Sequence, residues 1–450
     1  MSFEWKKYTI ADVSKKVITG KTPPGTLDKY FGGEVLFVTP TDMGDNKYIE
    51  LTQRTLSDEG EAKLAKQKFE CGIVVSCIGW QMGKAAIVRN TAVTNQQINT
   101  IIPNGDLIDV DFLYYTLSEK RTEIFNLGAT ATRTPILKKS LFERIEFHAP
   151  KLEQQKKIGN ILSSLDAKII SNKEINQTLE QMAQALFKSW FVDFEPVKAK
   201  IAVLETGGSQ EAATLAAMAA ISGKDTDALV VFEREDPEQY TELKATAELF
   251  PSAMQDSELG AVPKGWMSAS LGSILEPKKG KNITKKTIEE GDVPVVAGGL
   301  TPAYYHSKCN VTGPVITISA SGANAGFVNL YHCDIWASDC SYINKTQTHF
   351  VYCFYTFLKI KQEEITHMQQ GAAQPHVYPK DLMRLGIVIP TMALWKKLEE
   401  ILNSIYGQIG VHLNQNMYLE SLRDTLLPKL ISGEITLPEA EQAVSEVENV

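Results

Sequence analysis

Residues 158–187 read IGNILSSLDAKIISNKEINQTLEQMAQALF, and residues 398–427, which lie 240 positions later, read LEEILNSIYGQIGVHLNQNMYLESLRDTLL. The two stretches align without a gap. Matching positions pair Ile158 with Leu398, Ile161 with Ile401, Leu162 with Leu402, Ser164 with Ser404, Leu165 with Ile405, Ile169 with Ile409, Asn176 with Asn416, Leu179 with Leu419, Glu180 with Glu420 and Leu186 with Leu426. The apolar spacing predicts two long helices, over 151–190 and 391–430, in a chain built by internal duplication.

The segments ahead of these two helices are also related. At an offset of 243 residues, Ser76, Gly79, Gly83, Phe112 and Gly128 fall on Ser319, Gly322, Gly326, Tyr355 and Gly371, and Trp5 and Gly20-Lys21 resemble Trp266 and Gly280-Lys281. Short β-branched runs predict strands at 35–38, 73–76, 86–88, 98–102, 293–296, 315–319 and 387–389, with helices at 112–118 and 351–362. We therefore expect an α+β fold with two similar globular domains, 1–150 and 265–390, each followed by a long helix.

Charge is unevenly distributed along the chain. The 450 residues have a formal net charge of −8, and residues 191–264 alone contain 6 basic and 14 acidic side chains. The globular domains are close to neutral, with 19 basic and 18 acidic residues in 1–150, and 11 and 9 in 265–390. Local clusters of positive charge, which nucleic-acid phosphates require, therefore remain possible on them. We expect 191–264 to be an exposed acidic connection with some helix, and 431–450 to be a C-terminal tail.

The two long helices are expected to pair as an antiparallel coiled coil. Heptad a positions are Ile158, Leu165, Asn172, Leu179 and Leu186, then Leu398, Ile405, His412, Leu419 and Leu426; d positions are Ile161, Lys168, Ile175 and Met182, then Ile401, Gln408, Gln415 and Leu422. Polar residues in such a seam commonly fix its register, and we interpret His412 as one of them rather than as a ligand. Parallel pairing, or packing of each helix on its own domain, is the alternative.

Antiparallel pairing would hold the two domains apart on one rod. Roughly 37 residues at a rise of 1.5 Å give a length of about 55 Å, which exceeds one turn of DNA at roughly 34 Å. Two similar readers on a rigid spacer fit two DNA half-sites separated by bases that are not read.

Motifs expected of enzymes and metal sites are missing. Residues 22–25 (TPPG) lack the polar and aromatic ends of the (N/D)PP(Y/F) loop of amino-methyltransferases, and Gly20-Lys21-Thr22 lacks the first glycine of a phosphate-binding loop. The cysteines Cys71, Cys77, Cys309, Cys333, Cys340 and Cys353 have neither CxxC nor zinc-finger spacing. With no signal peptide and no membrane-length apolar run, we expect a non-catalytic, metal-free protein of the cytoplasm.

Polar, glycine-containing loops at strand ends are candidates for reading DNA, because side chains reach base edges while the backbone approaches phosphate. Two matched loops fit, namely 76–84 (SCIGWQMGK), with Ser76, Trp80, Gln81 and Lys84, and 319–326 (SASGANAG), with Ser319, Ser321 and Asn324. Further candidate base readers are Gln96, Gln97 and Arg133, then Gln374 and His376 in the counterpart of the Arg133 loop. Lys21 and Lys281 are candidate phosphate contacts. For each residue the alternative is an ordinary turn or a solvated side chain.

Three aromatic residues follow the first long helix. Trp190, Phe191 and Phe194 are interpreted as exposed anchors for a partner protein, because aromatic side chains dominate many interfaces. Packing against the end of the second helix is the alternative.

Four segments carry a family resemblance. They are 186–197 (LFKSWFVDFEPV), 256–260 (DSELG) with Pro263, Gly265 and Trp266, 371–377 (GAAQPHV) and 426–435 (LLPKLISGEI). Together they resemble the conserved regions of specificity subunits of type I DNA restriction-modification systems, and the similarity spans essentially the whole chain. The globular domains vary freely within that family, so the resemblance does not disclose a target sequence.

The resemblance implies two target-recognition domains, each reading one half of a bipartite double-stranded DNA site, on helices that dock two methylase subunits. The methylase core would recruit the restriction subunits that translocate DNA. S-adenosylmethionine would bind the methylase and ATP the motor, so no cofactor is expected on this chain. The alternative function is a coiled-coil structural or adaptor protein, which a salt-dependent DNA affinity seen with a methylase partner would exclude.

Overall fold

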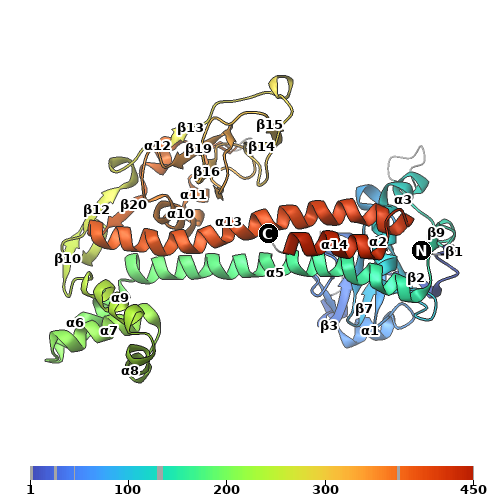
Figure 1. The fold of residues 1–450 in the computed structure, drawn as a ribbon, viewed down its shortest axis with the longest axis horizontal. Helices are drawn as coiled ribbons and strands as arrows, with labels where there is room; N and C mark the ends of the chain where they lie inside the picture. Colours follow the sequence, from blue (N-terminus) through green and yellow to red (C-terminus); the bar gives the residue numbers. More distant parts are fainter. Residues whose placement is uncertain (1–3, 25–27, 45, 129–134, 372–374, 449–450) are drawn as a thin grey trace. The chain divides into compact units, whose positions relative to one another are not determined.

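The structure is a computed structural model that describes residues 4–24, 28–44, 46–128, 135–371 and 375–448. It divides into two compact units, unit 1 with residues 1–172 and 414–450 and unit 2 with residues 173–413. Both boundaries fall inside the long helices α5 (Leu152–Phe191) and α13 (Met392–Ser432) (Figure 1). Each unit therefore contains one globular domain and a segment of both helices, and the two predicted long helices are confirmed within two residues.

Three small sheets form the globular domain of unit 1. A four-stranded sheet has the order β2-β8-β5-β6, a three-stranded sheet the order β4-β3-β7, and β1 pairs with β9. The strands are β1 (Lys6–Thr9), β2 (Ser14–Thr19), β3 (Phe31–Val38), β4 (Thr55–Leu56), β5 (Gly72–Ser76), β6 (Ala85–Val88), β7 (Ala92–Thr94), β8 (Ile98–Pro103) and β9 (Glu146–Ala149). The helices are α1 (Asp58–Lys63), α2 (Val110–Glu119), α3 (Arg121–Gly128) and α4 (Lys139–Phe142).

Unit 2 repeats this plan strand by strand. The sheets are β13-β19-β16-β17, β15-β14-β18 and β12-β20. Their strands are β12 (Met267–Ser270), β13 (Lys278–Lys279), β14 (Val293–Val296), β15 (Tyr304–His306), β16 (Val315–Ser319), β17 (Val328–Tyr331), β18 (Trp336–Ala337), β19 (Cys340–Asn344) and β20 (Gly386–Ile389). Helices α10 (Val351–Ile360), α11 (Gln362–His367) and α12 (Pro379–Leu382) complete the domain. The parallel strand pairing also recurs, β3 with β7 and β14 with β18.

The uniformly apolar runs become the central strands. All five residues of β5 and all five of β16 are buried, because each strand lies between two partners and is covered on both faces. Such continuous apolar runs are typical of fully buried strands. Every strand predicted from the sequence is present, whereas the predicted helix 351–362 is divided between α10 and α11 at Lys361.

The repeat offset shifts between the sheets and the helix that follows. The Cα pairing of β5 with β8 is repeated by that of β16 with β19. The two pairings coincide when 243 is added to the residue numbers of β5 and 242 to those of β8. In α2 and α10, the hydroxyls of Thr116 and Thr356 each donate to the carbonyl four residues earlier, at 2.8 Å in both cases, which gives an offset of 240. Phe112 therefore corresponds to Tyr352, and the predicted equivalence with Tyr355 is wrong.

Within each unit the two helix segments run antiparallel. In unit 1, Asp166 of α5 contacts Arg423 of α13 and Asn172 contacts Asn416. In unit 2, Asn176 contacts His412 and Phe191 contacts Trp395. In both units the partner number on α13 falls as the number on α5 rises, so the predicted antiparallel pairing is confirmed.

One of the two predicted seam rows is wrong. Row a is buried or half-buried throughout, but Lys168, Ile175 and Met182 of the predicted d row are exposed, as is Gln408 of the second copy. The second row consists of the residues one position later, which are Leu162, Ile169, Asn176, Ala183 and Trp190, then Leu402, Ile409, Asn416, Arg423 and Leu430. The covered face of each helix is therefore rotated by one residue from the predicted one.

Polar residues in the seam bond to each other across the helix pair. Asn172 Nδ2 donates to Asn416 Oδ1 at 2.8 Å in unit 1, and His412 Nδ1 lies 2.8 Å from Asn176 Oδ1 in unit 2. Since 172 and 412, and likewise 176 and 416, are equivalent positions, the same polar contact is made in both copies. Side-chain hydrogen bonds of this kind penalise a shifted register, because a shift would leave buried amides unpaired.

The acidic segment contains more helix than expected. It forms α6 (Glu195–Glu205), α7 (Gln210–Ser222), α8 (Thr226–Glu235) and α9 (Pro237–Glu248), followed by the hairpin β10 (Met254–Ser257) and β11 (Gly260–Pro263). A small apolar cluster of Ala217, Met218, Leu229 and Ala247 holds α7, α8 and α9 together. The C-terminal tail is also partly helical, because α14 (Leu437–Glu448) buries Leu437 and Ala440 in the core of unit 1.

Candidate nucleic-acid interface

In unit 1 the loop 76–84 meets two other segments singled out from the sequence. The joining backbone bonds run from Lys21 N to Thr94 O (2.8 Å), Cys77 N to Gln97 O (2.8 Å), Gly79 N to Pro135 O (2.9 Å) and Leu137 N to Cys77 O (2.9 Å). We call this assembly of 20–22, 76–84, 94–97 and 135–137 reading surface 1. The structure therefore brings the candidate segments of the first domain together.

Unit 2 builds the same assembly with the same bonds. They run from Lys281 N to Ala337 O (2.9 Å), Ala320 N to Asp339 O (3.1 Å), Gly322 N to Pro375 O (3.0 Å) and Val377 N to Ala320 O (3.0 Å). We call 280–282, 319–327, 337–339 and 375–377 reading surface 2. Arg133 and Gln374 come shortly before 135–137 and 375–377 in the sequence, but they lie outside the described residues.

Glycines explain why the two loops look alike in sequence. Gly79 and Gly83 have φ of +69° and +84°, and their counterparts Gly322 and Gly326 have +85° and +84°. Side chains disfavour this left-handed region, so glycine is required where the hairpin loop turns. The matched glycines thus indicate a conserved backbone path with side chains that differ between the copies.

The repeated Gly-Lys pair also has a structural reason. A Cβ on Gly20 would lie 2.1 Å from the Asn95 carbonyl oxygen, and one on Gly280 would lie 2.3 Å from that of Ser338. Glycine therefore lets the chain pass close to the neighbouring strand end. The side chains of Lys21 and Lys281 that follow are exposed, as phosphate contacts would need to be.

On reading surface 1 the candidate side chains differ in exposure. Trp80 is 83% exposed and stacks on Phe125 with ring centroids 6.1 Å apart, and Gln81 is exposed. Lys84 is half-buried, Gln96 Oε1 accepts a bond from Thr22 at 2.5 Å, and Gln97 Oε1 accepts one from Asn95 at 3.2 Å. Ser76 is fully buried, so its side chain supports the loop from inside and does not face a ligand.

Reading surface 2 repeats that division between support and exposure. Ser319 is 5% exposed, whereas Ser321 and Asn324 are half-buried. The Ser321 hydroxyl donates to Asp339, and the ring of His376 stacks on Tyr378 with centroids 5.9 Å apart. The two serines at the strand ends, Ser76 and Ser319, are the candidates whose burial opposes direct base contact.

Sequence reasoning missed four lysines beside Lys281. Lys278 and Lys279 form the edge strand β13, and Lys285 and Lys286 lie in the short helical turn that follows; all four are exposed. The run 278–286 (KKGKNITKK) is conspicuously basic, but its significance depends on knowing that 280–282 belong to reading surface 2. Five exposed lysines within nine residues provide the local positive charge that phosphate contacts need.

Substitution at the two kinds of position should give different results. Lys281→Ala is expected to weaken binding to all DNA sequences alike and to lower the slope of log affinity against log salt by about 1, because one phosphate contact is lost. Asn324→Ala should instead change discrimination within one half-site, by roughly 1–3 kcal/mol per base pair. Fluorescence anisotropy with cognate and scrambled duplexes at several salt concentrations measures both. An unaltered preference in the Asn324 variant would remove that residue from the reading set.

The aromatic residues after the first long helix are not exposed. Trp190, Phe191 and Phe194 are 0%, 4% and 8% exposed and belong to the core of unit 2. Phe191 packs against Trp266 at 5.4 Å and Trp395 at 5.9 Å between ring centroids. The expectation that they form an exposed partner surface is wrong: Phe191 packs on Trp395 of α13, as the alternative interpretation held, while Phe250 packs on Trp190 and Trp266 on Phe194.

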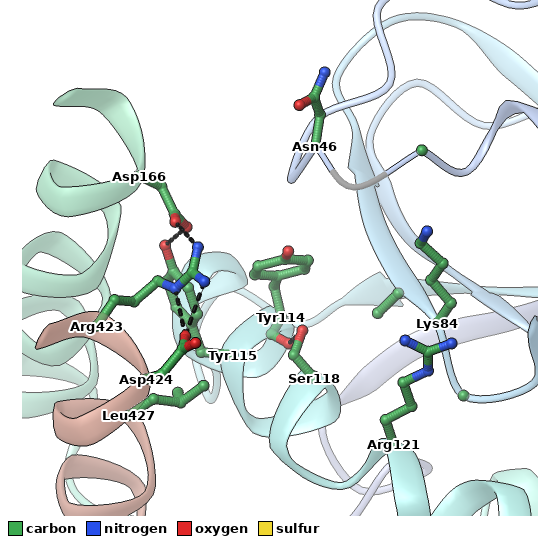
Figure 2. A pocket seen from close by; sticks show the side chains of 13 residues that line it. Asn46, Lys84, Tyr114, Tyr115, Ser118, Arg121, Asp166, Arg423, Asp424 and Leu427 are labelled. Atoms are coloured by element: carbon green, nitrogen blue, oxygen red, sulfur yellow. Dashed lines mark hydrogen bonds and ion pairs between the residues drawn. The ribbon is translucent and has the colours of Figure 1, made fainter. Parts of the chain in front are cut away.

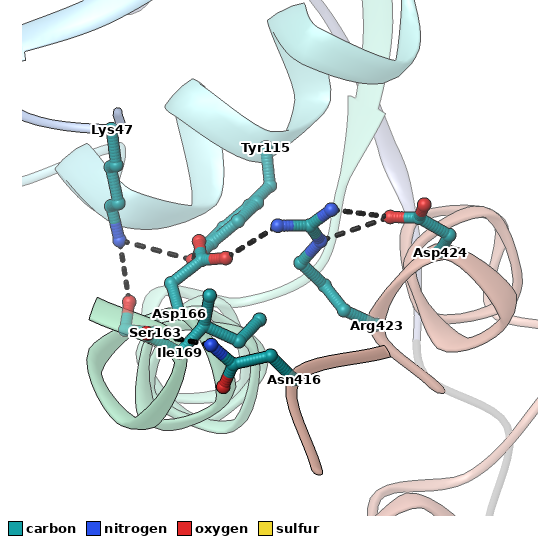
Figure 3. Close-up of polar contacts among 8 residues, drawn as sticks. All are labelled: Lys47, Tyr115, Ser163, Asp166, Ile169, Asn416, Arg423 and Asp424. Carbon is teal, nitrogen blue, oxygen red and sulfur yellow. Dashed lines mark hydrogen bonds and ion pairs between the residues drawn. The ribbon is translucent and has the colours of Figure 1, made fainter. Parts of the chain in front are cut away.

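A buried charge network joins the domain of unit 1 to both of its helix segments (Figure 3). Lys47, whose side chain is 2% exposed, lies 2.6 Å from Asp111 Oδ1 and donates to Ser163 Oγ at 2.6 Å. Asp166 accepts bonds from Tyr115 at 2.5 Å and from Arg423 at 2.8 Å. Charge-assisted hydrogen bonds thereby link the loop that contains Lys47 to α2, α5 and α13.

Burial shifts the acid–base behaviour of this network. Burial lowers the pKa of Lys47, and the nearby Asp111 carboxylate partly offsets that effect. Burial also raises the pKa of Tyr115, and the negative charge of Asp166 raises it further. Although burial alone would lower the pKa of Arg423, its bonds to Asp166 and Asp424 raise it. The raised pKa values keep Tyr115 neutral and Arg423 positively charged at neutral pH.

A cleft of about 380 Å³ lies between this network and the base of the loop 76–84 (Figure 2). Lys84 and Arg121 line one side of it, and Arg423 with its partners Asp166 and Asp424 lines the other. The bottom of the cleft is formed by Tyr114 and further α2 residues. Lys84 of the loop 76–84 and the charged side chains of the network thus line the same cleft within unit 1.

No metal-binding group of three or more His, Cys, Asp or Glu side chains occurs in the described part of the chain. In the same residues, no helix is both long and apolar enough to cross a membrane. All six cysteines are free thiols.

Comparison with known proteins gives a consistent result. A profile of the family described as "Type I restriction modification DNA specificity domain" matches residues 3–181 and 263–419. The chain is 30% identical to the type I restriction enzyme HindI specificity subunit of Haemophilus influenzae, over 96% of this chain and 100% of that protein. It is 26% identical to the MjaIX specificity subunit of Methanocaldococcus jannaschii, over 97% of this chain and 94% of that protein.

A solved structure also resembles the whole chain. The S subunit of a type I restriction-modification system from M. genitalium superposes with a TM-score of 0.52 at 17% identity, covering 95% of this chain and 96% of that one. At this level of identity the resemblance concerns the fold, and the profile match over both repeats is the more specific result.

Proposed function

The chain belongs to the family of type I restriction-modification DNA specificity domains, and we propose that it selects the DNA site for such a system, with each reading surface binding one half of a bipartite double-stranded site. The observation that carries this proposal is the duplication of one surface. Loop, Gly-Lys pair and flanking segment are joined by equivalent backbone bonds in both units. Two equivalent surfaces with different side chains are what recognition of two different half-sites requires.

The helices are proposed to set the separation of the half-sites and to dock two methylase subunits. Antiparallel contacts and the polar seam pairs of Asn172 with Asn416 and of His412 with Asn176 support a fixed register of the helix pair. A fixed register is needed for a spacer, because slippage by one turn would change the distance by about 5.4 Å. Exposed apolar side chains on the outer helix faces, such as Ile175, Met182 and Met417, are candidates for the methylase contact.

The chain itself is proposed to be non-catalytic. S-adenosylmethionine would bind the methylase and ATP the restriction subunits, which would join through the methylase core. Both partners and the DNA would meet in the cytoplasm. The competing function, a coiled-coil adaptor that binds only proteins, is disfavoured by the family match over both globular domains.

Co-expression with the cognate methylase tests the proposed function directly. Adenines methylated across the host genome are expected to define a single motif of two short sequences separated by a fixed number of unread base pairs. Salt-dependent DNA binding that appears mainly with the methylase present is the second expected result. A continuous motif, or complexes that bind protein partners but no DNA, would contradict the proposal.

Shortening both helices should change the spacer. Deleting seven residues from each helix, at equivalent positions outside the polar pairs, removes about 10.5 Å of rise and should shorten the preferred gap by about three base pairs. The half-site sequences should stay the same. The control deletes seven residues from one helix only, which breaks the pairing register and should reduce binding. An unchanged gap in the double deletion would refute the spacer role.

A further inference from the structure

Reading surface 2 has an acid where reading surface 1 has an amide. Cys77 N donates to the Gln97 carbonyl, and its counterpart Ala320 N donates to the Asp339 carbonyl. Gln97 and Asp339 are therefore equivalent positions, and the offset of 242 between them is the one found for the adjoining strands β8 and β19. The bonds that join these two positions to their loops are equivalent, although the segment 94–97 is one residue longer than 337–339, and the two side chains differ in chemistry.

The loop 319–326 holds Asp339 in place. Its carboxylate accepts a hydrogen bond from the Ser321 hydroxyl, and Ser321 itself pairs with His376 in an isolated β-bridge. Asp339 is half-buried, and within the described residues Ser321 is the side chain that bonds its carboxylate. One carboxylate oxygen therefore stays available as an acceptor, fixed between the loop 319–326 and the segment 375–377.

A carboxylate is electrostatically unfavourable on a surface that binds phosphate. It repels the backbone charge, whereas Lys278, Lys279 and Lys281 beside it attract that charge. An ionised carboxylate only accepts hydrogen bonds, so its partner on DNA must be a donor at a base edge. The exocyclic N4 amino group of cytosine in the major groove is the donor that Asp and Glu read.

Gln97 offers a different combination at the equivalent position. Its Oε1 accepts a bond from Asn95 Nδ2 at 3.2 Å, which orients the amide. An amide carries both an acceptor and a donor, the pair that matches N6 and N7 of adenine. The two copies of the surface thus present adenine-type and cytosine-type chemistry at one shared position.

We propose that Asp339 is a specificity-determining residue that reads the amino group of a cytosine in the half-site bound by unit 2, and that Gln97 reads an adenine at the matching position of the half-site bound by unit 1. This inference rests on the proposed function. It also predicts that the two half-sites differ at this position even though the two reading surfaces are joined by equivalent backbone bonds.

The test maps methylated adenines in cells that express the full chain with its cognate methylase. Asp339→Asn is expected to change one position of one half-site from cytosine toward adenine, with a loss of cytosine preference of roughly 5- to 150-fold in binding to defined duplexes. Gln97→Asp should change one position of the other half-site from adenine toward cytosine. Asp292→Asn, which makes the same charge change at an exposed position of unit 2, should leave both half-sites unchanged.

The outcomes separate this inference from the proposed function. If Asp339→Asn keeps the bipartite motif with both half-sites unaltered, Asp339 does not read a base and the inference falls, while the proposed function stands. If Asp339→Asn does not fold, Gln97→Asp decides, because an unaltered half-site there overturns the inference equally. If the unmodified chain directs no bipartite methylation at all, the proposed function itself fails.

Discussion

Replacement of Asp166 by alanine is expected to destabilise unit 1 by about 1–3 kcal/mol, because Arg423 and Tyr115 both lose the carboxylate that they bond. Asp166 is 8% exposed, and the bonds to it measure 2.5 Å from Tyr115 and 2.8 Å from Arg423. The substitution leaves the buried Tyr115 hydroxyl without its acceptor, and Arg423 loses one of its two carboxylate partners and keeps Asp424. Hydrogen exchange of α2 amides in urea would report the change in the free energy of unfolding for this unit.

Two controls make the network interpretation specific. Lys7 and Glu146 form an ion pair at 2.7 Å with both side chains 57% exposed, so Lys7→Ala should cost less than about 1 kcal/mol. Asp166→Ala combined with Arg423→Ala should cost less than the sum of the single substitutions, with a coupling of about 1–3 kcal/mol. Strict additivity would show that the two side chains do not act as a pair in solution.

The network should also influence recognition by unit 1. Lys84 of the loop 76–84 lines the cleft beside the network, and we expect loss of the contact between Asp166 and Arg423 to disorder that loop. A destabilised variant that folds at low temperature would therefore keep the half-site of unit 2 while its half-site preference in unit 1 weakens.

Trp190→Ala is expected to destabilise unit 2 by about 3–5 kcal/mol, the usual effect of truncating a buried tryptophan. Trp190 is 0% exposed and packs edge-to-face on Phe250 with ring centroids 5.1 Å apart. The cavity lies where the last turn of α5 meets the core, so amide exchange at the start of α13 should accelerate. Urea-dependent hydrogen exchange of residues 394–409 measures the effect.

Trp80→Ala is the matched control for that substitution. Trp80 is 83% exposed, so its removal should change stability by no more than about 0.5 kcal/mol while altering DNA binding. Normal stability of the Trp190 variant together with loss of methylase binding would instead restore the interpretation of Trp190 as a partner anchor.

Much of the architecture follows from local patterns in the sequence. The apolar spacing of 158–187 and 398–427 predicted both long helices, and the β-branched runs predicted the strands, because periodicity and propensity are properties of short segments. The matched glycines Gly79, Gly83, Gly322 and Gly326 located the two loops, since a left-handed backbone turn leaves its mark on residue type. Placement of the loops needed no knowledge of the tertiary structure.

Tertiary packing decided which of two chemically similar residues is buried. Ile161 and Leu162 are both apolar, and only the position of the domain core determines that Leu162 is fully buried while Ile161 lies at its margin. The sequence likewise presents Trp190 and Trp80 as two aromatic residues, and packing on Phe250 within the core of unit 2 buries the first alone. Lys47 meets Asp111 and Asp166 meets Arg423 across separations that no local pattern records. Asp339 is recognised as the equivalent of Gln97 only from the backbone bonds that each makes to its own loop. Such bonds join segments that are distant in the sequence, so no local pattern predicts the equivalence.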